Sequence, residues 1–284
     1  MSTIFALIDG STYSRSVCDH AAWAAGRTGA PVELLHVLGP RLGPTEAPDL
    51  SAYLNTEAID QLLQELAAHD EQAAKLAQRR ARAILDAARA RMAEDGVADV
   101  TVRLRQGDLV ETLSGLEAAT GLVVVGKRGE AADFAKLHLG SNLERILRSS
   151  QRPVLVASRA FRPIARVLVA FDAGPSAINA VAHIAADALL RGLPIRLLTV
   201  GSPSAQAGAR LAEAEAMLRT AGYDATSDVR PGQPEEVIAE VVRQGAADLL
   251  VMGAYGHSRI RTLFIGSTTT DVIRSCLIPV LLFR

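Results

Sequence analysis

The stretch VMGAYGHSRIRTLFIGSTTTDVIRS, residues 251–275, places three glycines between an apolar run and a helical pattern. The apolar run ends at Gly253, a polar loop surrounds Gly256, and hydroxyl residues follow Gly266 directly. Glycine lets a chain turn sharply and lets a ligand approach the backbone, and a helix start presents unpaired N–H groups and the positive end of its dipole. The pattern therefore predicts an anion site built from backbone amides and hydroxyls, with no lysine after the last glycine.

The helix that follows carries its own capping signal. Ser267 or Thr268 is expected to cap the helix TTTDVIRSC, and Asp271 falls three residues after Thr268, the spacing of a capping box. Ligands of open α/β sheets bind beyond the carboxyl ends of the strands. The turn at Met252–Gly253 is therefore expected to lie at the same site.

The chain contains two copies of one pattern in the same order, which indicates a duplication. Each copy begins with an apolar strand, an aspartate, a Gly/Ser-rich turn and a helical pattern. The matching pairs, in chain order, are the segment from Ser2 with that from Ala165, Val32–Val37 with Ile195–Val200, Val100–Leu113 with Ala225–Ile238, Gly121–Gly129 with Asp248–Gly256, and Arg152–Ala157 with Ile278–Phe283.

Each half alternates five strands with four helices. Continuous Val/Leu/Ile runs indicate strands that are covered on both faces, and alternation with helices predicts a parallel sheet. We therefore expect an α/β protein with two tandem, doubly wound (Rossmann-like) domains, each with a five-stranded, mostly parallel sheet. The segment Ser158–Pro163 interrupts the pattern, so the domains are expected to span residues 1–158 and 164–284.

The first half carries an insertion of about residues 40–75 between its second and third strands. Residues 40–51 are typical of a loop, and residues 59–92 predict one long helix or two broken helices with one apolar stripe. The simpler interpretation is that this helical segment packs on its own domain. The more specific interpretation is that it forms a surface that docks a partner protein.

The last strand of each half follows a proline and ends its repeat. An edge strand leaves unpaired N–H and C=O groups, which favour pairing with another strand. We expect Pro153–Ala157 and Pro279–Phe283 to lie side by side across a pseudo-twofold axis.

The composition excludes several classes of function. The 284 residues are 49% apolar and 21% charged, with a formal net charge of -1, so no basic field points to nucleic acid. The sequence shows no apolar run of membrane-spanning length and no signal peptide, so a cytoplasmic protein is expected. Cys18 and Cys276 lie far apart and are expected to be buried thiols, and the histidine spacing suits no metal site.

The arrangement Gly253, two residues, Gly256, nine residues, Gly266 and Ser267-Thr268 resembles the nucleotide motif of the universal stress protein family. Together with the strand before the motif, the helix after it and the duplication, nearly the whole chain is similar to a tandem member of that family. The resemblance implies a stress-responsive regulatory protein that binds an adenine nucleotide, ATP, with Mg²⁺ as the ion that phosphates usually bring. It also implies an unknown protein partner and an intrachain pseudo-dimer or a homodimer.

The resemblance assigns roles by position in the second half. Asp172 and Val200 would lie beside the adenosine, and Met252 and Gly253 would flank the nucleotide where the fourth strand ends. The phosphates would be held by the remaining motif residues, Gly256, Gly266, Ser267 and Thr268.

The first half departs from the motif, which predicts a second, weaker site. Ten residues rather than nine separate Gly129 from Gly140, and Asn142 stands where the second hydroxyl residue is expected. Ser141 has Glu144 at capping-box spacing. The matching positions are Asp9, Val37, Gly126, Gly129, Gly140, Ser141 and Asn142, while Lys127 and Arg128 are either phosphate ligands or solvated charges.

Three other functions compete with a regulatory nucleotide-binding protein. One is a slow ATP hydrolase that uses His257, Arg259 and Arg261, although no carboxylate is placed as its base. Another is a protein-interaction scaffold with degenerate nucleotide sites that acts through the insertion. The third is a relative of electron-transfer flavoproteins or of ATP pyrophosphatases. The latter expect a Ser-Gly-Gly-rich loop after the first strand, which IDGSTYS and FDAGPSA do not provide.

Overall fold

The computed structural model describes residues 2–39, 56–127, 140–254 and 267–284, and each half alternates strands and helices as predicted. The elements of the first half are β1 (Thr3–Leu7), α1 (Ser14–Thr28), β2 (Val32–Leu38), α2 (Thr56–Glu94), β3 (Val100–Gln106), α3 (Leu109–Leu116), the 3₁₀ turn η1 (Glu117–Ala119), β4 (Thr120–Gly126), α4 (Ser141–Ser149) and β5 (Val154–Ala157). Those of the second half are β6 (Val167–Ala170), α5 (Pro175–Ala186), β7 (Ile195–Val200), α6 (Ala205–Thr220), β8 (Ala225–Arg230), α7 (Pro234–Arg243), β9 (Leu249–Gly253), α8 (Ser267–Ser275) and β10 (Val280–Phe283).

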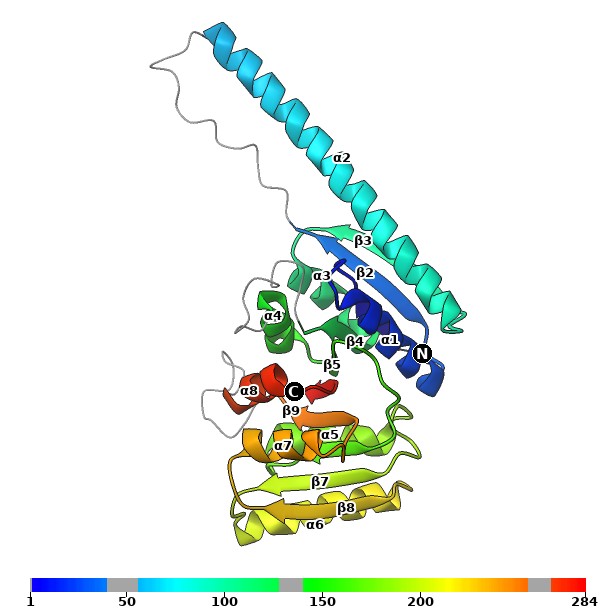
Figure 1. The fold of residues 1–284 in the computed structure, drawn as a ribbon, viewed down its shortest axis with the longest axis vertical. Helices are drawn as coiled ribbons and strands as arrows, with labels where there is room; N and C mark the ends of the chain where they lie inside the picture. The colour runs from blue at the N-terminus through cyan, green and yellow to red at the C-terminus, as the bar shows by residue number, and fades with distance from the viewer. Residues whose placement is uncertain (1, 40–55, 128–139, 255–266) are drawn as a thin grey trace.

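The ten strands form one continuous sheet in the order β3-β2-β1-β4-β5-β10-β9-β6-β7-β8 (Figure 1). All neighbouring strands run parallel except β5 and β10, which pair antiparallel with Val280 opposite Val156 and Leu282 opposite Val154. The predicted pairing of the two last strands is therefore confirmed. The order within each half is the same when read outward from this central pair, as a pseudo-twofold axis requires.

Two layers of helices cover the sheet and explain the continuous apolar runs. One face packs against α1, α2, α5 and α6, through side chains such as Val17, Leu85 and Leu218. The other face packs against α3, α4, α7 and α8, through side chains such as Ile146 and Val241. Strands with both faces buried need no polar alternation, and this is why the central strands consist almost entirely of aliphatic residues.

The two outer strands carry charge where the sheet ends. Arg103 of β3 pairs with Glu33 of β2, and Arg196 of β7 pairs with Asp228 of β8. Charged side chains at a sheet edge discourage further strand addition. The free edges of β3 and β8 are thus protected, while the uncharged β5 and β10 pair with each other.

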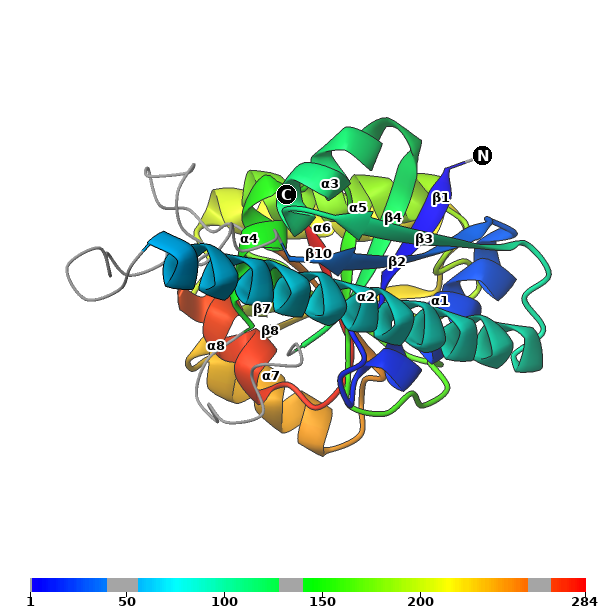
Figure 2. The same cartoon turned by 90° about the horizontal axis from the view of Figure 1, so that it is seen from above.

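Helix α2 is one uninterrupted helix of 39 residues, so the broken-helix alternative was wrong (Figures 1 and 2). Its last part buries Leu85, Ala88 and Met92 against the sheet, whereas residues 60–80 are mostly exposed and Leu76 is 60% exposed. Alanine, leucine, glutamate and arginine are strong helix formers, and they continue through the whole segment. Among the described residues, no helix combines the length and the apolar character needed to cross a membrane.

Candidate functional site

Within each half, the strand order brings the predicted site residues together at the carboxyl ends of that half's parallel strands. In the second half, β6 lies between β9 and β7, so the carboxyl ends of three parallel strands are neighbours. The chain continues from β6 to β7 on one side and from β9 to β10 on the other, which makes the junction of β6 and β9 a topological switch point, where open α/β sheets bind ligands. The first half repeats the arrangement with β4, β1 and β2.

The structure places the second-half residues on four elements of this edge. Asp172 follows β6 and is exposed, while Val200 ends β7 and is half-buried. Met252 is buried and Gly253 half-buried at the end of β9. Ser267 and Thr268 are the first residues of α8. Gly256 and Gly266 lie outside the described residues, as do His257, Arg259 and Arg261.

The first-half residues occupy the equivalent positions. Asp9 is half-buried after β1, Val37 lies one residue before the end of β2, and Gly126 ends β4. Gly140 precedes α4, whose first two residues are Ser141 and the exposed Asn142. Gly129 and Arg128 lie outside the described residues.

The aspartate turn has the same geometry in both halves. Asp172 Oδ1 accepts the Gly174 N–H at 2.8 Å, and Asp9 Oδ1 accepts the Ser11 N–H at 2.9 Å. A carboxylate that accepts the amide two residues later forms an Asx turn, which fixes the orientation of the side chain. The carboxylate at each strand end is therefore held in place before any ligand arrives.

The residue after each aspartate adopts a left-handed conformation. Gly10 has φ +80° and Ala173 has φ +58°. Only glycine adopts this region without cost, and a strained non-glycine residue persists where the surroundings hold it. Ala173 is 4% exposed, and its carbonyl accepts the Arg210 Nη1–H at 3.0 Å. The strained turn beside Asp172 is thus stabilised by a guanidinium from α6.

Arg210 is a site residue that the sequence pattern did not reveal. The buried residues of α2 and α6 have the same spacing, which aligns Leu85 with Leu211, Ala88 with Ala214 and Met92 with Leu218. This register places Arg210 where the first half has Ile84, whose side chain lies against Gly10. A cation stands beside the aspartate turn in one half and an aliphatic side chain in the other. The alignment of the buried residues of α2 and α6 would have identified Arg210, but the two helices share too little sequence for that alignment to be recognised.

A second contact locks the neighbouring strand to the aspartate turn. Thr199 Oγ1 donates to the Phe171 carbonyl at 2.8 Å, and His36 Nδ1 lies 2.6 Å from the Ile8 carbonyl. Because a carbonyl accepts, the His36 Nδ1 carries the proton. These buried bonds hold the end of β7 against the turn of β6, and the end of β2 against the turn of β1. They fix the backbone at Val200 next to Asp172.

Gly253 is required by packing within the protein. A Cβ added there would lie 2.7 Å from Ser176 Cβ and 3.3 Å from the Ala177 amide nitrogen. Contacts under 3.0 Å force a displacement, so the glycine lets the N-terminus of α5 approach the end of β9. Thr269, which is buried, reaches the Gly253 carbonyl with its hydroxyl at 3.4 Å. The first turn of α8 is thereby held at the same strand end.

The helix starts differ from the capping predictions. Helix α4 has Gly140 at its N-cap with no side-chain hydrogen bond, and Glu144 pairs with Arg148 at 3.1 Å. The predicted capping box of Ser141 and Glu144 was therefore wrong, because Ser141 lies inside the first turn. Helix α8 begins at Ser267, so Thr268 also lies inside the helix.

Lys127 contacts the other half of the chain. Its Nζ donates to the Cys276 carbonyl at 2.7 Å, just beyond the end of α8. The carboxyl end of a helix attracts cations. This bond links the end of β4 in the first half to the carboxyl end of α8 in the second half.

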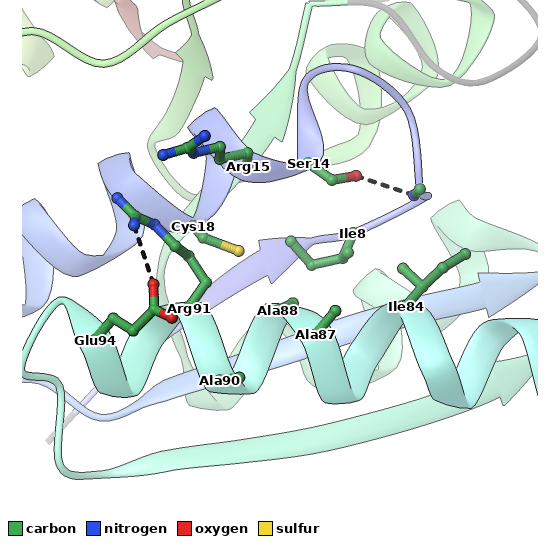
Figure 3. Close-up of a pocket in the computed structure, with 11 residues that line it drawn as sticks. Ile8, Ser14, Arg15, Cys18, Ile84, Ala87, Ala88, Ala90, Arg91 and Glu94 are labelled. Carbon is green, nitrogen blue, oxygen red and sulfur yellow. Dashed lines mark hydrogen bonds and ion pairs between the residues drawn. The ribbon is translucent and has the colours of Figure 1, made fainter.

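An apolar cavity of about 410 Å³ lies beside the Asp9 turn, and the sequence pattern did not reveal it (Figure 3). Ile8, which follows β1, and Cys18 of α1 face Ile84 and Ala88 of α2 across it. Burial raises the pKa of the Cys18 thiol to about 12, so the thiol remains neutral and acts as an apolar wall. Arg91 closes one end through ion pairs with Asp19 at 2.9 Å and Glu94 at 3.2 Å.

The described residues contain no group of His, Cys, Asp and Glu side chains that could hold a metal ion.

Comparison with known proteins shows the family. The profile of the universal stress protein family matches residues 1–158 and 163–284. The universal stress protein Slr1230 of Synechocystis sp. is 37% identical over 287 residues, which cover 100% of both chains. A universal stress protein of Mycolicibacterium smegmatis is 26% identical over 98% of this chain and 95% of its own. A crystal structure of a universal stress protein from Archaeoglobus fulgidus matches with a TM-score of 0.67 and 22% identity, covering 99% of this chain and 96% of that chain. The chain belongs to the universal stress protein family.

Proposed function

We propose that this chain is a stress-responsive regulatory protein that binds ATP at the carboxyl edge of the second half. The proposal treats residues 1–158 and 164–284 as two domains with one potential site each. In the second domain, Asp172 and Val200 contact the adenosine and Met252 and Gly253 flank the nucleotide. Gly256, Gly266, Ser267 and Thr268 hold the phosphates.

The observation that carries the proposal is the convergence of β6, β7, β9 and α8 at one switch point. The Asx turn holds the Asp172 carboxylate, and the Thr199 bond fixes Val200 beside it. The start of α8 is tied to the end of β9 through Thr269. A carboxylate suited to ribose hydroxyls and a helix N-terminus suited to phosphate are thus attached to neighbouring strand ends.

The second domain is favoured over the first by two differences. Arg210 brings a guanidinium to the strained turn after Asp172, whereas Ile84 occupies that position in the first domain. The first domain also has the longer motif loop and the exposed Asn142 at the second helical position. We therefore assign a weaker site, or none, to Asp9, Val37 and Gly126.

Calorimetric titration of the purified chain with ATP tests the proposal, with GTP as the control nucleotide. We expect saturable ATP binding that is at least about tenfold tighter than GTP binding, a difference of ~1.4 kcal/mol. The variant Gly266→Leu should weaken ATP binding because a side chain would occupy the position of the phosphates. Absence of binding at millimolar ATP, or unchanged affinity in Gly266→Leu, would count against it.

Turnover is a separate property. A phosphate-release assay run on the same preparation distinguishes an ATP-binding regulator from a slow hydrolase, because only the latter consumes the nucleotide. We propose the regulator, since Asp172 is assigned to the adenosine side and the first turn of α8 contains no acidic residue.

A further inference from the structure

The first helix of each half holds the end of its own repeat in the same way. Ser16 Oγ donates to the Ser158 carbonyl at 2.7 Å, and Asn179 Nδ2 donates to the Arg284 carbonyl at 2.7 Å. The repeat makes Ser16 equivalent to Asn179, and makes Ser158 equivalent to Arg284. The surroundings of these two carbonyls can therefore be compared residue by residue.

In the first half, the segment that joins the two repeats covers α1. Phe161 of this segment packs edge-on against His20, with ring centroids 5.0 Å apart and an interplanar angle of 88°. Edge-to-face contact is a preferred geometry for rings. His20 is fully buried, and Phe161 packs against the core that α1 shares with the sheet. Phe161 thus covers this histidine, and we term the place that Phe161 occupies beside His20 the groove of the first half.

In the second half, the equivalent position is a cavity of about 330 Å³, which we term the inter-half cavity. Residues from both halves line it, among them Ser2, Gly121, Pro153, Asn179, His183 and Phe283. The volume lies at the lower end of the range for ligand-binding pockets.

The inter-half cavity and the groove of the first half are the same place in the two repeats. The pairs that establish this are Asn179 with Ser16 and His183 with His20, while Ser2, Gly121 and Pro153 of the cavity have Ala165, Asp248 and Pro279 as their sequence equivalents. All these equivalences come from the repeat itself. The segment around Phe161 in the first half is therefore a template for what fits the inter-half cavity.

The histidine ring that borders the inter-half cavity is accessible, whereas its neighbour Phe283 is only 3% exposed. His183 is equivalent to the buried His20, yet its side chain is 42% exposed. The ring of Phe283 lies 5.1 Å from that of His183 and stands where the first half has Ala157. Two rings therefore border a cavity in which an additional ring could make the contact that Phe161 makes with His20.

We propose that the inter-half cavity binds an extended segment of a partner protein that inserts an aromatic side chain against His183 and Phe283. The template sets the chemistry of the occupant, because residues 158–163 have the sequence Ser-Arg-Ala-Phe-Arg-Pro with arginine on either side of the aromatic residue. The cavity adds a carboxylate that the first half lacks. Asp187, whose Oδ2 lies 3.9 Å from His183 Nε2, replaces the buried Ala24. A basic residue next to the aromatic one can pair with Asp187, while Arg152 on the same lining leaves the cavity without a net negative charge.

A peptide titration tests the proposal directly. The probe is a fluorescein-labelled, amide-capped peptide of sequence Ser-Arg-Ala-Phe-Arg-Pro, and the matched probe has alanine in place of the phenylalanine. Fluorescence anisotropy on the full chain should show saturable binding of the first peptide at up to millimolar protein. The alanine peptide should bind at least about fivefold more weakly, as expected for loss of one buried ring contact.

Two protein variants locate the binding. His183→Ala removes one ring and should weaken binding by about fivefold, whereas His183→Phe keeps a ring and should retain it. Ala30→Trp places a large side chain in the cavity wall and should abolish binding. Thermal unfolding of each variant, compared with the parent chain, separates loss of binding from loss of fold.

Three outcomes would overturn the proposal. These are no saturable binding of the phenylalanine peptide, equal affinity for the two peptides, and unchanged affinity in both His183→Ala and Ala30→Trp. If N-acetylphenylalaninamide binds as tightly as the hexapeptide, the cavity is a small-molecule site and the assignment to a peptide is wrong.

Discussion

Leu155 of β5 lies directly opposite Leu281 of β10, and each is the equivalent of the other in the repeat. The pseudo-twofold axis therefore passes between these two leucines, which are 0% and 1% exposed. Because the two halves contribute to one continuous sheet here, the pair determines how the two cores are joined.

Truncation at this pair should destabilise the whole chain. Leu281→Ala removes a buried side chain from the central strands and should lower the free energy of unfolding by about 3 kcal/mol. The control is Leu277→Ala, since Leu277 is 77% exposed and its loss should change stability by less than about 0.5 kcal/mol. Chemical denaturation followed by circular dichroism measures both, and equal stability of the two variants would refute the role of the central pair.

Gly253 should tolerate no side chain. Gly253→Ala pushes a Cβ against Ser176 and should cost about 1–3 kcal/mol of stability. It should also weaken ATP binding, because α5 and β9 would separate at the proposed site. Gly26→Ala is the matched control, since nothing lies within 4 Å of the added Cβ in helix α1. That change should stabilise the chain by up to about 1 kcal/mol. A melting temperature that rises in both variants would contradict the packing argument.

Arg210 should affect ATP affinity indirectly, through its hydrogen bond to the turn that follows Asp172. Arg210→Ile installs the first-half residue and removes the hydrogen bond to the strained Ala173 carbonyl. Such a bond to a charged donor contributes about 1.5–3 kcal/mol, so ATP affinity should fall about tenfold in calorimetry. The exposed Arg243→Ile serves as the control for loss of one positive charge. Equal affinity in the two variants would remove Arg210 from the site.

The buried His20 should make the chain sensitive to acid. Burial lowers the pKa of His20 below its usual value of 6.5, because the charged ring loses its hydration. The stabilisation is therefore present above pH 6.5 and is lost as the pH falls through the lower folded-state pKa. In His20→Leu, the free energy of unfolding should fall less steeply than in the parent chain as the pH drops below 6.5. Identical slopes in the variant and the parent chain would show that His20 does not cause the decline.

The repeat made much of the fold predictable. The order of elements could be predicted because each strand and helix has a local apolar pattern that recurs in the same order in both halves. The pairing of Pro153–Ala157 with Pro279–Phe283 could be predicted because each ends its repeat. Whether α2 was one helix or two stayed open, since both alternatives satisfy the same 3.6-residue periodicity. The capping box at Ser141 failed because helix starts depend on backbone geometry that Gly140 determines.

The candidate site was predictable only in part. The strand ends near Asp172, Val200 and Gly253 could be located, because parallel strands end at the same edge. Arg210 could not, since its role depends on the register between α2 and α6, which share little sequence beyond their buried positions. The collision that makes Gly253 necessary involves Ser176 on another element, and such packing reasons are not visible in sequence.

The central claim is that the second half binds ATP and that Asp172 takes part. A matched pair of variants tests it, because Asp172→Asn and Asp9→Asn alter equivalent carboxylates in equivalent Asx turns, and asparagine can preserve each turn. In calorimetric titration with ATP we predict a loss of at least about tenfold in affinity for Asp172→Asn, ~1.4 kcal/mol, and near-parental affinity for Asp9→Asn. Equal affinities in both variants, or a larger loss in Asp9→Asn, would contradict the assignment of the site to the second half.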